Sequence, residues 1–219
     1  MISIKNNREI KALYDKLLDA IKNDSHKFDI DKLRVFTTLV GREYPIEHNK
    51  GIIFYGRATN GWDDDEFNEL EPVLEKEYWR PFFNLLYYFA WDFYGDSWRS
   101  KVAWSNICKI APDGGNPSNA LWYAQYDRII EIIRKEVDLL SPEIVVLVTG
   151  NTAGARWEEP FFEAFPNLKE IKSIKWAESR GYDCTATLFT DGKMKVLLTD
   201  RPEFRPIGAH SNALTTLLK

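Results

Sequence analysis

The sequence contains few of the residues that form disulfides or bind transition metals. Among its 219 residues there are two cysteines, Cys108 and Cys184, and three histidines, His26, His48 and His210. Two cysteines cannot supply a four-thiolate metal or iron–sulfur site, and no histidine has a second His or Cys at zinc-ligand spacing. We therefore expect no metal, no cofactor and no disulfide framework, and we expect both thiols to be buried and inert.

The sequence also lacks a long apolar run. No segment approaches the length of a membrane span, and the opening residues, MISIKNNREI, are too polar for a signal peptide. We expect a cytoplasmic protein that has no membrane partner. There is no composition shift, low-complexity tract or internal repeat, which predicts a single domain over residues 1–219.

An excess of basic residues is absent too. The net charge is −4 at pH 7, whereas a protein that coats nucleic acid by electrostatics alone needs an excess of Lys and Arg. A local basic groove is compatible with this charge, and Arg99, Lys101 and Lys109 either line such a surface or are simply solvated. No glycine-rich stretch has the spacing of a Walker, Rossmann or nucleophile-elbow motif.

What the sequence does contain is a series of apolar segments with helical spacing. This spacing predicts helices over residues 8–22 and 31–39, which form a helical N-terminal extension within residues 1–45, and a long aromatic helix over 74–94. The extension is expected to pack on the rest of the domain.

Turn and capping residues limit these and later helices. Pro81 predicts a break in the aromatic helix, and Gly95 predicts its end. Ser118 is suited to cap a long helix that follows it, and Ser211 to cap a short terminal helix. A further helix is expected over residues 155–165.

Four apolar runs predict strands, over residues 51–56, 101–111, 141–150 and 195–199. The run CTATLFT is a further strand segment that leads through a turn at Asp191 and Gly192 into the last of them. The run IVVLV is continuous, as a strand covered on both faces requires. We therefore predict an α/β fold of three layers, α/β/α, with a central, mainly parallel, four-stranded sheet.

The carboxyl ends of parallel strands are where such sheets bind ligands. That rule selects the loops GRATNGWDDD, SNICKIAPDGGNPS, TGNTAG and TDRPEFRP. In the first loop, Gly56 and Gly61 are expected where a ligand approaches the backbone, and Arg57 lies between them in the chain.

The same four loops carry a resemblance to a known family. The segments IIFYGRATNG, VAWSNICKIAP, SPEIVVLVTG and LLTDRPEF resemble, in this order, the motifs of the uracil-DNA glycosylase superfamily, and GAHSNALTTLL resembles the segment that follows them. The resemblance covers roughly residues 52–218 and leaves the N-terminal helices outside it. It implies a DNA base-excision glycosylase that hydrolyses the N-glycosidic bond of uracil or a related damaged base, held flipped in a pocket.

The resemblance also assigns roles to two side chains. The Asn106 amide would complement N3–H and O4 of uracil together, whereas an asparagine at a strand end can also merely cap a loop. Arg201, followed by Pro202, stands where the family commonly has a histidine. It would stabilise charge on the departing base or clamp a phosphate, or it would form only a local ion pair with Asp200 or Glu203.

The first motif departs from the family pattern, because the family activates water with an Asp, Glu or Asn inside it. Here Asn60 is able to position a water but is a poor base, and Asp63 and Asp64 come after the motif. A carboxylate there would act as base if it folded back toward the water, but a run of aspartates is more often a solvated helix start. Trp62 is either a stacking ring or a core residue.

Three functions fit these features. The first is a glycosylase acting on DNA, and the second is a catalytically silent module of the same fold that binds a nucleotide or nucleic acid. The third is a hydrolase of a small nucleotide-like molecule. Asn106 favours the first, and the missing motif acid favours the second. The expected partner is DNA or a nucleotide-like ligand, and the oligomeric state is left open.

Overall fold

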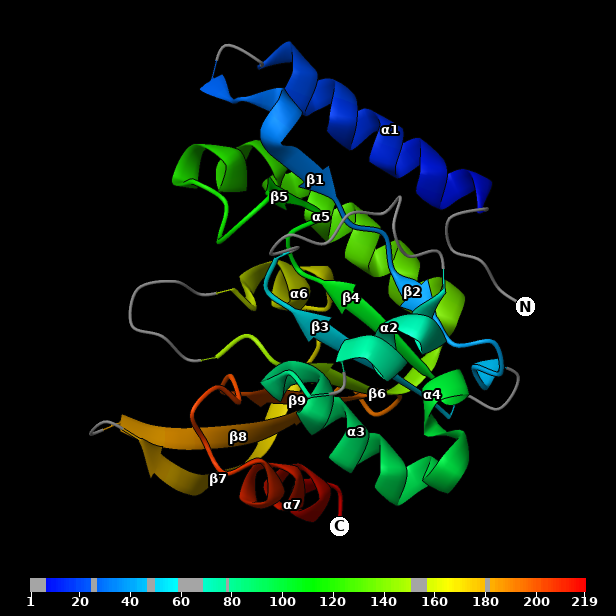
Figure 1. Ribbon diagram of the computed structural model, residues 1–219, viewed down its shortest axis with the longest axis vertical. Coiled ribbons are helices and arrows are strands. Elements are labelled where there is room, and N and C mark those ends of the chain that lie inside the picture. Colours follow the sequence, from blue (N-terminus) through cyan, green and yellow to red (C-terminus); the bar gives the residue numbers. More distant parts are fainter. Residues whose placement is uncertain are drawn as a thin grey trace.

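The computed structural model describes residues 7–24, 27–46, 50–58, 69–77, 79–150, 157–179 and 182–219. Within these ranges the chain has a mixed α/β fold in which helices cover both faces of a sheet (Figure 1). The sheet has seven strands in the order β2-β4-β3-β6-β9-β8-β7, so the predicted number of four is wrong.

The four predicted strands form the parallel centre of this sheet. In spatial order they are β4 (Val102–Asn106), β3 (Gly51–Gly56), β6 (Pro142–Leu147) and β9 (Lys195–Thr199). Ile52 pairs with Val102 and Ile53 with Val145, which in turn pairs with Val196. The carboxyl ends of these strands therefore meet at one edge, as the sequence predicted.

Three antiparallel strands widen the sheet. β2 (Leu39–Val40) pairs with β4, β8 (Tyr182–Thr190) pairs with β9, and β7 (Lys169–Ser179) pairs with β8. β8 and the turn before β9, where Gly192 has φ +89°, confirm the prediction for that segment. The sequence does not predict β7, because its run KEIKSIKWAES is rich in charge. Such charges suit an edge strand, since they discourage pairing with another chain.

Two predicted elements are wrong. Residues 31–39 form no helix but a 3-10 turn, η3 (Ile30–Lys32), followed by β1 (Leu33–Val35) and then β2. The predicted strand 101–111 is split, because β4 ends at Asn106 and β5 (Ile110–Pro112) pairs with β1 instead. In both places strand pairing, which depends on a distant partner, outweighs the local pattern.

Helices form one layer on each face of the sheet (Figure 1). On one face lie α1 (Arg8–Asn23), α5 (Asn119–Leu140) and α6 (Glu159–Ala164). On the other lie α2 (Leu70–Glu77), α3 (Pro81–Tyr94), α4 (Trp98–Lys101) and α7 (Ile207–Leu218), with the short turn η5 (Gly95–Ser97) between α3 and α4.

Capping follows the sequence in two cases and departs from it in a third. Ser118 accepts the N–H of Leu121 at 3.2 Å and so caps α5 as predicted. Gly95, with φ +53°, ends α3. Ser211 does not cap the last helix, because α7 begins four residues earlier, directly after Pro206. Pro206 is itself the N-cap residue and provides no side-chain hydrogen bond to the first turn.

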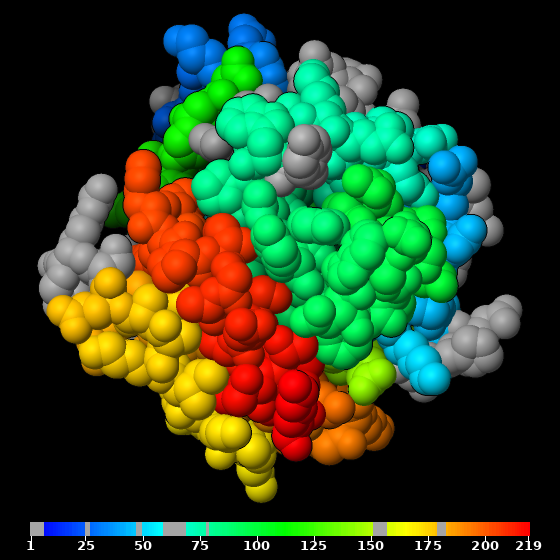
Figure 2. Space-filling model, turned by 60° about the horizontal axis from the view of Figure 1, so that its bottom comes forward, coloured from blue at the N-terminus to red at the C-terminus, as the bar shows by residue number. Residues whose placement is uncertain are grey.

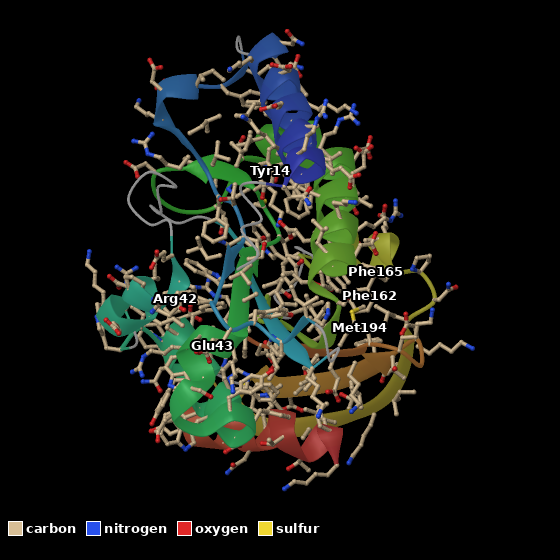
Figure 3. The ribbon with its side chains drawn as sticks, turned by 90° about the vertical axis from the view of Figure 1, so that its right-hand side faces the viewer. Tyr14, Arg42, Glu43, Phe162, Phe165 and Met194 are labelled. Atoms are coloured by element: carbon tan, nitrogen blue, oxygen red, sulfur yellow. The ribbon has the colours of Figure 1, made fainter. Side chains whose placement is uncertain are left out.

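Side chains of the central strands alternate between the two layers. Ile53 and Tyr55 pack toward α1, α5 and α6, whereas Ile52 and Phe54 pack toward α2, α3 and α7. Figure 3 labels three further side chains of the first layer: Phe162, Phe165 and Met194. In the second layer α7 lies between α3 and β7 (Figure 2). Within the described ranges, no helix has both the length and the apolar character of a membrane span.

Both cysteines are buried, as expected. Burial raises the pKa of the Cys108 thiol well above its usual range. A thiol that stays protonated is a poor nucleophile.

Candidate functional site

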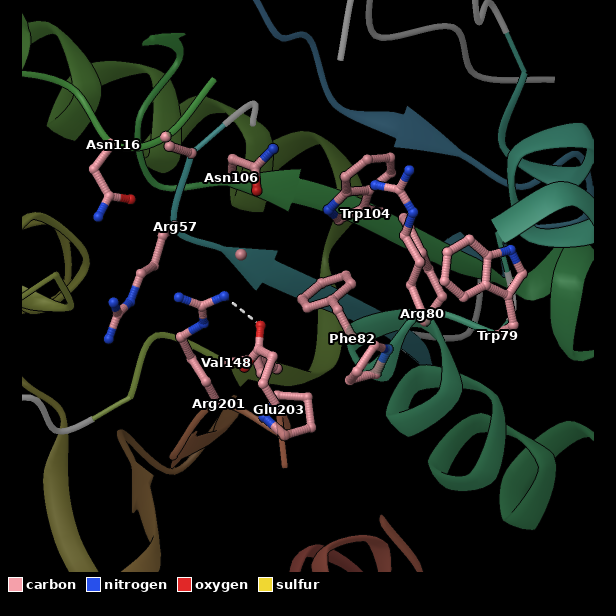
Figure 4. Close-up of a pocket in the computed structure, with 16 residues that line it drawn as sticks. Arg57, Trp79, Arg80, Phe82, Trp104, Asn106, Asn116, Val148, Arg201 and Glu203 are labelled. Atoms are coloured by element: carbon pink, nitrogen blue, oxygen red, sulfur yellow. Dashed lines mark hydrogen bonds and ion pairs between the residues drawn. The ribbon is translucent and has the colours of Figure 1, made fainter. Parts of the chain in front are cut away.

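A cavity of about 430 Å³ opens where the four parallel strands end (Figure 4). Gly56 ends β3, Asn106 ends β4, Val148 follows β6 and Arg201 follows β9, and all four residues line the cavity. The start of α3 closes the opposite side. The remaining lining residues are Arg57, Ala58, Trp79, Arg80, Pro81, Phe82, Phe83, Trp104, Gly115, Asn116, Pro202 and Glu203.

The structure brings together half of the site residues that the sequence suggested. Gly56, Arg57, Asn106, Arg201 and Pro202 all line this pocket. The other candidates lie outside the described residues: Asn60, Gly61, Trp62, Asp63 and Asp64. Their roles, and the roles of the five that share the pocket, stay predictions.

Gly56 and Asn106 face each other across paired strands. A Cβ atom on Gly56 would lie 2.5 Å from Oδ1 of Asn106 and 3.6 Å from Cε2 of Phe82, so only a glycine leaves room for the amide. Asn106 is 2% exposed, and its Nδ2 has no hydrogen-bond partner. Because buried donors are normally paired, this amide is suited to bind a ligand atom in the cavity.

Aromatic rings form the side of the pocket next to Asn106 (Figure 4). The Phe82 ring lies 6.1 Å from the Trp104 ring, and Phe83 packs edge-on against Trp104 at 4.8 Å. Trp79 is 63% exposed at the rim. Phe82 is therefore a candidate stacking ring, which the sequence suggested only for Trp62. The sequence signal for Phe82 is weak, since it is one ring among many at the start of an aromatic helix.

Arginines form the other side of the pocket. Arg57 donates from Nε to the Thr149 carbonyl oxygen, and its guanidinium lies 5.5 Å from the Trp157 ring. Arg201 forms an ion pair with Glu203, which is one of the alternatives the sequence left open. Burial, and secondly the charge of Arg201, lower the pKa of Arg57 to about 10, so Arg57 is still a cation at neutral pH.

A fully buried ion pair lies under the pocket on the α5 side. Lys109 Nζ is 2.8 Å from both carboxylate oxygens of Glu136, and both side chains are 0% exposed. Both suggestions for Lys109, that it lines a strand-binding surface and that it is solvated, are therefore wrong. The reason is that Glu136, on a helix distant in the sequence, pairs with Lys109, and their attraction offsets the cost of removing the charge from water.

Hydroxyl groups complete this network. Tyr55 donates to Glu136 at 2.9 Å, Thr38 donates to it at 2.7 Å, and Ser105 lies 2.8 Å from Lys109 Nζ. Tyr55 and Ser105 directly precede Gly56 and Asn106, and successive side chains of a strand point to opposite faces. The network thus anchors the two strand ends that present the pocket residues.

His210 supports the strand end that leads to Arg201. Its ring stacks on Trp176 with centroids 4.0 Å apart, and its Nε2 is 2.6 Å from Oγ1 of Thr199, the last residue of β9. Burial, and secondly Arg205, lower the pKa of His210 to about 3. The ring is therefore neutral at physiological pH.

Neither a metal centre within the described residues nor a match to a known family identifies this site. Within the described residues, no three His, Cys, Asp or Glu side chains are placed together as ligands of a metal ion. No family model matches the chain, and no curated protein matches it. Membership in the uracil-DNA glycosylase superfamily therefore stays a prediction, and the case for a function has to come from the pocket.

Proposed function

We propose that the pocket binds a nucleobase of DNA and that the protein is a glycosylase which hydrolyses the N-glycosidic bond of uracil or a related damaged base. The observation that supports this most is the buried amide of Asn106 beside the Phe82 ring, whose Nδ2 has no hydrogen-bond partner. Recognition of a flipped base needs a ring to stack on and a polar group to read its edge. An amide offers a donor and an acceptor for that edge.

The proposed reaction is attack of water on C1′ with departure of the base as an anion. Cationic or donor groups that meet the developing charge lower the barrier. Arg201 has two roles that agree with this chemistry, at the base or at a phosphate. Activation of the water is assigned to Asn60, Asp63 or Asp64, which follow Arg57 in the sequence and lie outside the described residues.

Exposed rings at the rim favour DNA over an isolated base as the partner. Trp79 is 63% exposed, and Phe204, directly after the lining residue Glu203, is 86% exposed. Phe204 has φ +61°, a conformation that non-glycine residues rarely adopt and that costs energy. Proteins that distort DNA insert apolar side chains between base pairs, and Phe204 is suited to that role.

A catalytically silent nucleotide-binding module is the second candidate. The observation in its favour is that the lining residues in the described ranges include a single carboxylate, Glu203, and that this group is paired with Arg201. A carboxylate held by an arginine is a weaker base than one without a cation beside it.

Incubation of labelled DNA that carries uracil, hypoxanthine or a mismatch, in single and double strands, followed by alkaline cleavage, tests the proposal. We expect cleavage at one of these bases by the wild-type protein and loss of cleavage in Asn106→Ala. Asn212→Ala is the matched control, because Asn212 is an exposed asparagine of α7 that does not line the pocket. Binding without cleavage would favour the silent module, and neither binding nor cleavage would refute both.

A further inference from the structure

The two sides of the pocket differ in chemistry (Figure 4). Phe82 and Trp104 make one side aromatic, and Arg57 and Arg201 make the other cationic, with the Asn106 amide between the two sides. A cavity of about 430 Å³ has room for more than a base alone. A ligand that matches both sides has a planar ring and an anionic group.

A single glycine leaves room for both arginine side chains. Gly150 follows β6, the strand between β3 and β9, and has φ +74°. A Cβ atom there would lie 2.9 Å from Nη2 of Arg57 and 3.2 Å from Cγ of Arg201. Both side chains therefore lie against the same backbone position, one arriving from the end of β3 and the other from the end of β9.

The positive charges of Arg57 and Arg201 repel each other. Burial lowers the pKa of Arg57 most, and the charge of Arg201 lowers it further. Glu203 offsets part of this repulsion through its ion pair with Arg201. Arg80, the third arginine of the lining, forms an ion pair with Glu77, so the cationic side consists of Arg57 and Arg201 against one lining carboxylate, Glu203, in a chain whose net charge is −4. Charge of this sign concentrated in a concave site favours an anionic ligand.

We propose that Arg57 and Arg201 form a subsite for the phosphate of the nucleotide whose base lies between Asn106 and Phe82. Guanidinium groups suit this ligand because their planar, fixed donors match phosphate oxygens. The inference rests on the proposed function for the position of the base, and it assigns Arg201 to the phosphate. The ligand class is a nucleoside phosphate, either a free mononucleotide or one nucleotide of a DNA strand.

Titration calorimetry with deoxyuridine, deoxyinosine and their 3′- and 5′-monophosphates tests the subsite. We expect a monophosphate to bind about 10- to 100-fold more tightly than its nucleoside, because its phosphate would accept hydrogen bonds from the charged guanidinium groups. Arg57→Gln and Arg201→Gln should remove that advantage, so that each variant lowers the affinity for the monophosphate far more than the affinity for the nucleoside. Inorganic phosphate should compete with the monophosphate. Arg128→Gln, which changes an arginine of α5 outside the pocket, is the control.

The outcomes separate this inference from the proposed function. If nucleoside and monophosphate bind equally, the subsite is wrong, whereas base recognition stands. If inorganic phosphate and both monophosphates bind with equal affinity and Arg57→Gln abolishes this binding, but no nucleoside binds, the subsite stands and base recognition is wrong. If nothing binds, both are wrong.

A uracil-containing oligonucleotide that binds much more tightly than the monophosphate identifies a DNA strand as the source of the phosphate, and equal affinity identifies a free nucleotide. Circular dichroism melting of each variant checks that it is folded.

Discussion

Lys109 Nζ lies 2.8 Å from both carboxylate oxygens of Glu136, and water reaches neither side chain. The lysine comes from the loop after β4 and the glutamate from the last third of α5. Tyr14, at 3.4 Å, and Thr38, at 2.7 Å, also donate to this carboxylate, so the N-terminal segment takes part in the network. The segment that the family resemblance left unexplained therefore supports the strand that presents Asn106.

Removal of one partner of this pair should be costly. We expect Lys109→Met to lower the free energy of unfolding by about 3 to 5 kcal/mol, because Glu136 would be left buried without its cation. Urea denaturation measures the change. Arg128→Met is the control, since Arg128 and Glu131 form an exposed pair whose loss should cost less than about 1 kcal/mol. A double variant, Lys109→Met with Glu136→Leu, should recover part of the loss. A Lys109→Met protein as stable as the Arg128→Met control would contradict this account.

Gly56→Ala should displace the Asn106 amide from its position in the pocket. The added methyl group would lie 2.5 Å from Oδ1 of Asn106, so the amide has to move. We expect a stability loss of about 1 to 3 kcal/mol, typical of overpacking, together with loss of nucleotide binding. Gly208→Ala is the matched control, because a Cβ atom there has no neighbour within 4 Å and a helix favours alanine. Thermal melts and calorimetric titrations of both variants distinguish the site-specific effect from a general effect of alanine.

The sequence predicts the part of the site that depends on strand ends. IVVLV is apolar throughout because helices cover both faces of β6, and Gly56, Asn106 and Arg201 each come at or just after the end of a parallel strand. Once the strands are known, the meeting of these residues at one edge follows from the chain direction alone.

The remaining features depend on distant partners that local patterns do not reveal. From the sequence alone Lys109 is expected to be a solvated charge, because its partner Glu136 lies 27 residues later in the chain. Trp79 and Phe82, from the start of α3 and the residues before it, also line the pocket. Which aromatic ring faces the ligand depends on how that helix packs on the sheet. Residues 31–39 have helical spacing, yet they pair as β1 and β2 with strands about seventy residues away, which only the tertiary structure decides.

His210 should make the protein less stable in mild acid. Its pKa is about 3 in the folded state and 6.5 when unperturbed, so the unfolded chain binds a proton that the folded chain does not. Stability therefore falls as the pH drops below about 6.5, by about 2 kcal/mol between pH 7 and pH 5 from this group alone. Urea denaturation at several pH values measures the slope. His210→Gln should reduce it, and an unchanged slope in that variant would show that other groups cause it.

Asn106→Asp tests whether binding depends on the hydrogen-bond donor of the amide or only on the size of the side chain. Since the unpartnered atom is Nδ2, a ligand in the pocket should accept a hydrogen bond from it. Asn106→Ala should cost about 1 to 3 kcal/mol of binding free energy, for a ligand group left without its partner.

Asn106→Asp keeps the size of the side chain, but at pH 8 its carboxylate repels an acceptor, so binding should be at least as weak as in Asn106→Ala. On acidification to pH 6 the buried carboxyl, whose pKa burial raises, gains a proton to donate, and affinity should recover. Titrations at both pH values, with Asn212→Asp as the control, test this. Tight binding by Asn106→Asp at pH 8 would mean that the ligand presents a donor instead, and that the base is read by its N–H rather than by its carbonyl oxygen.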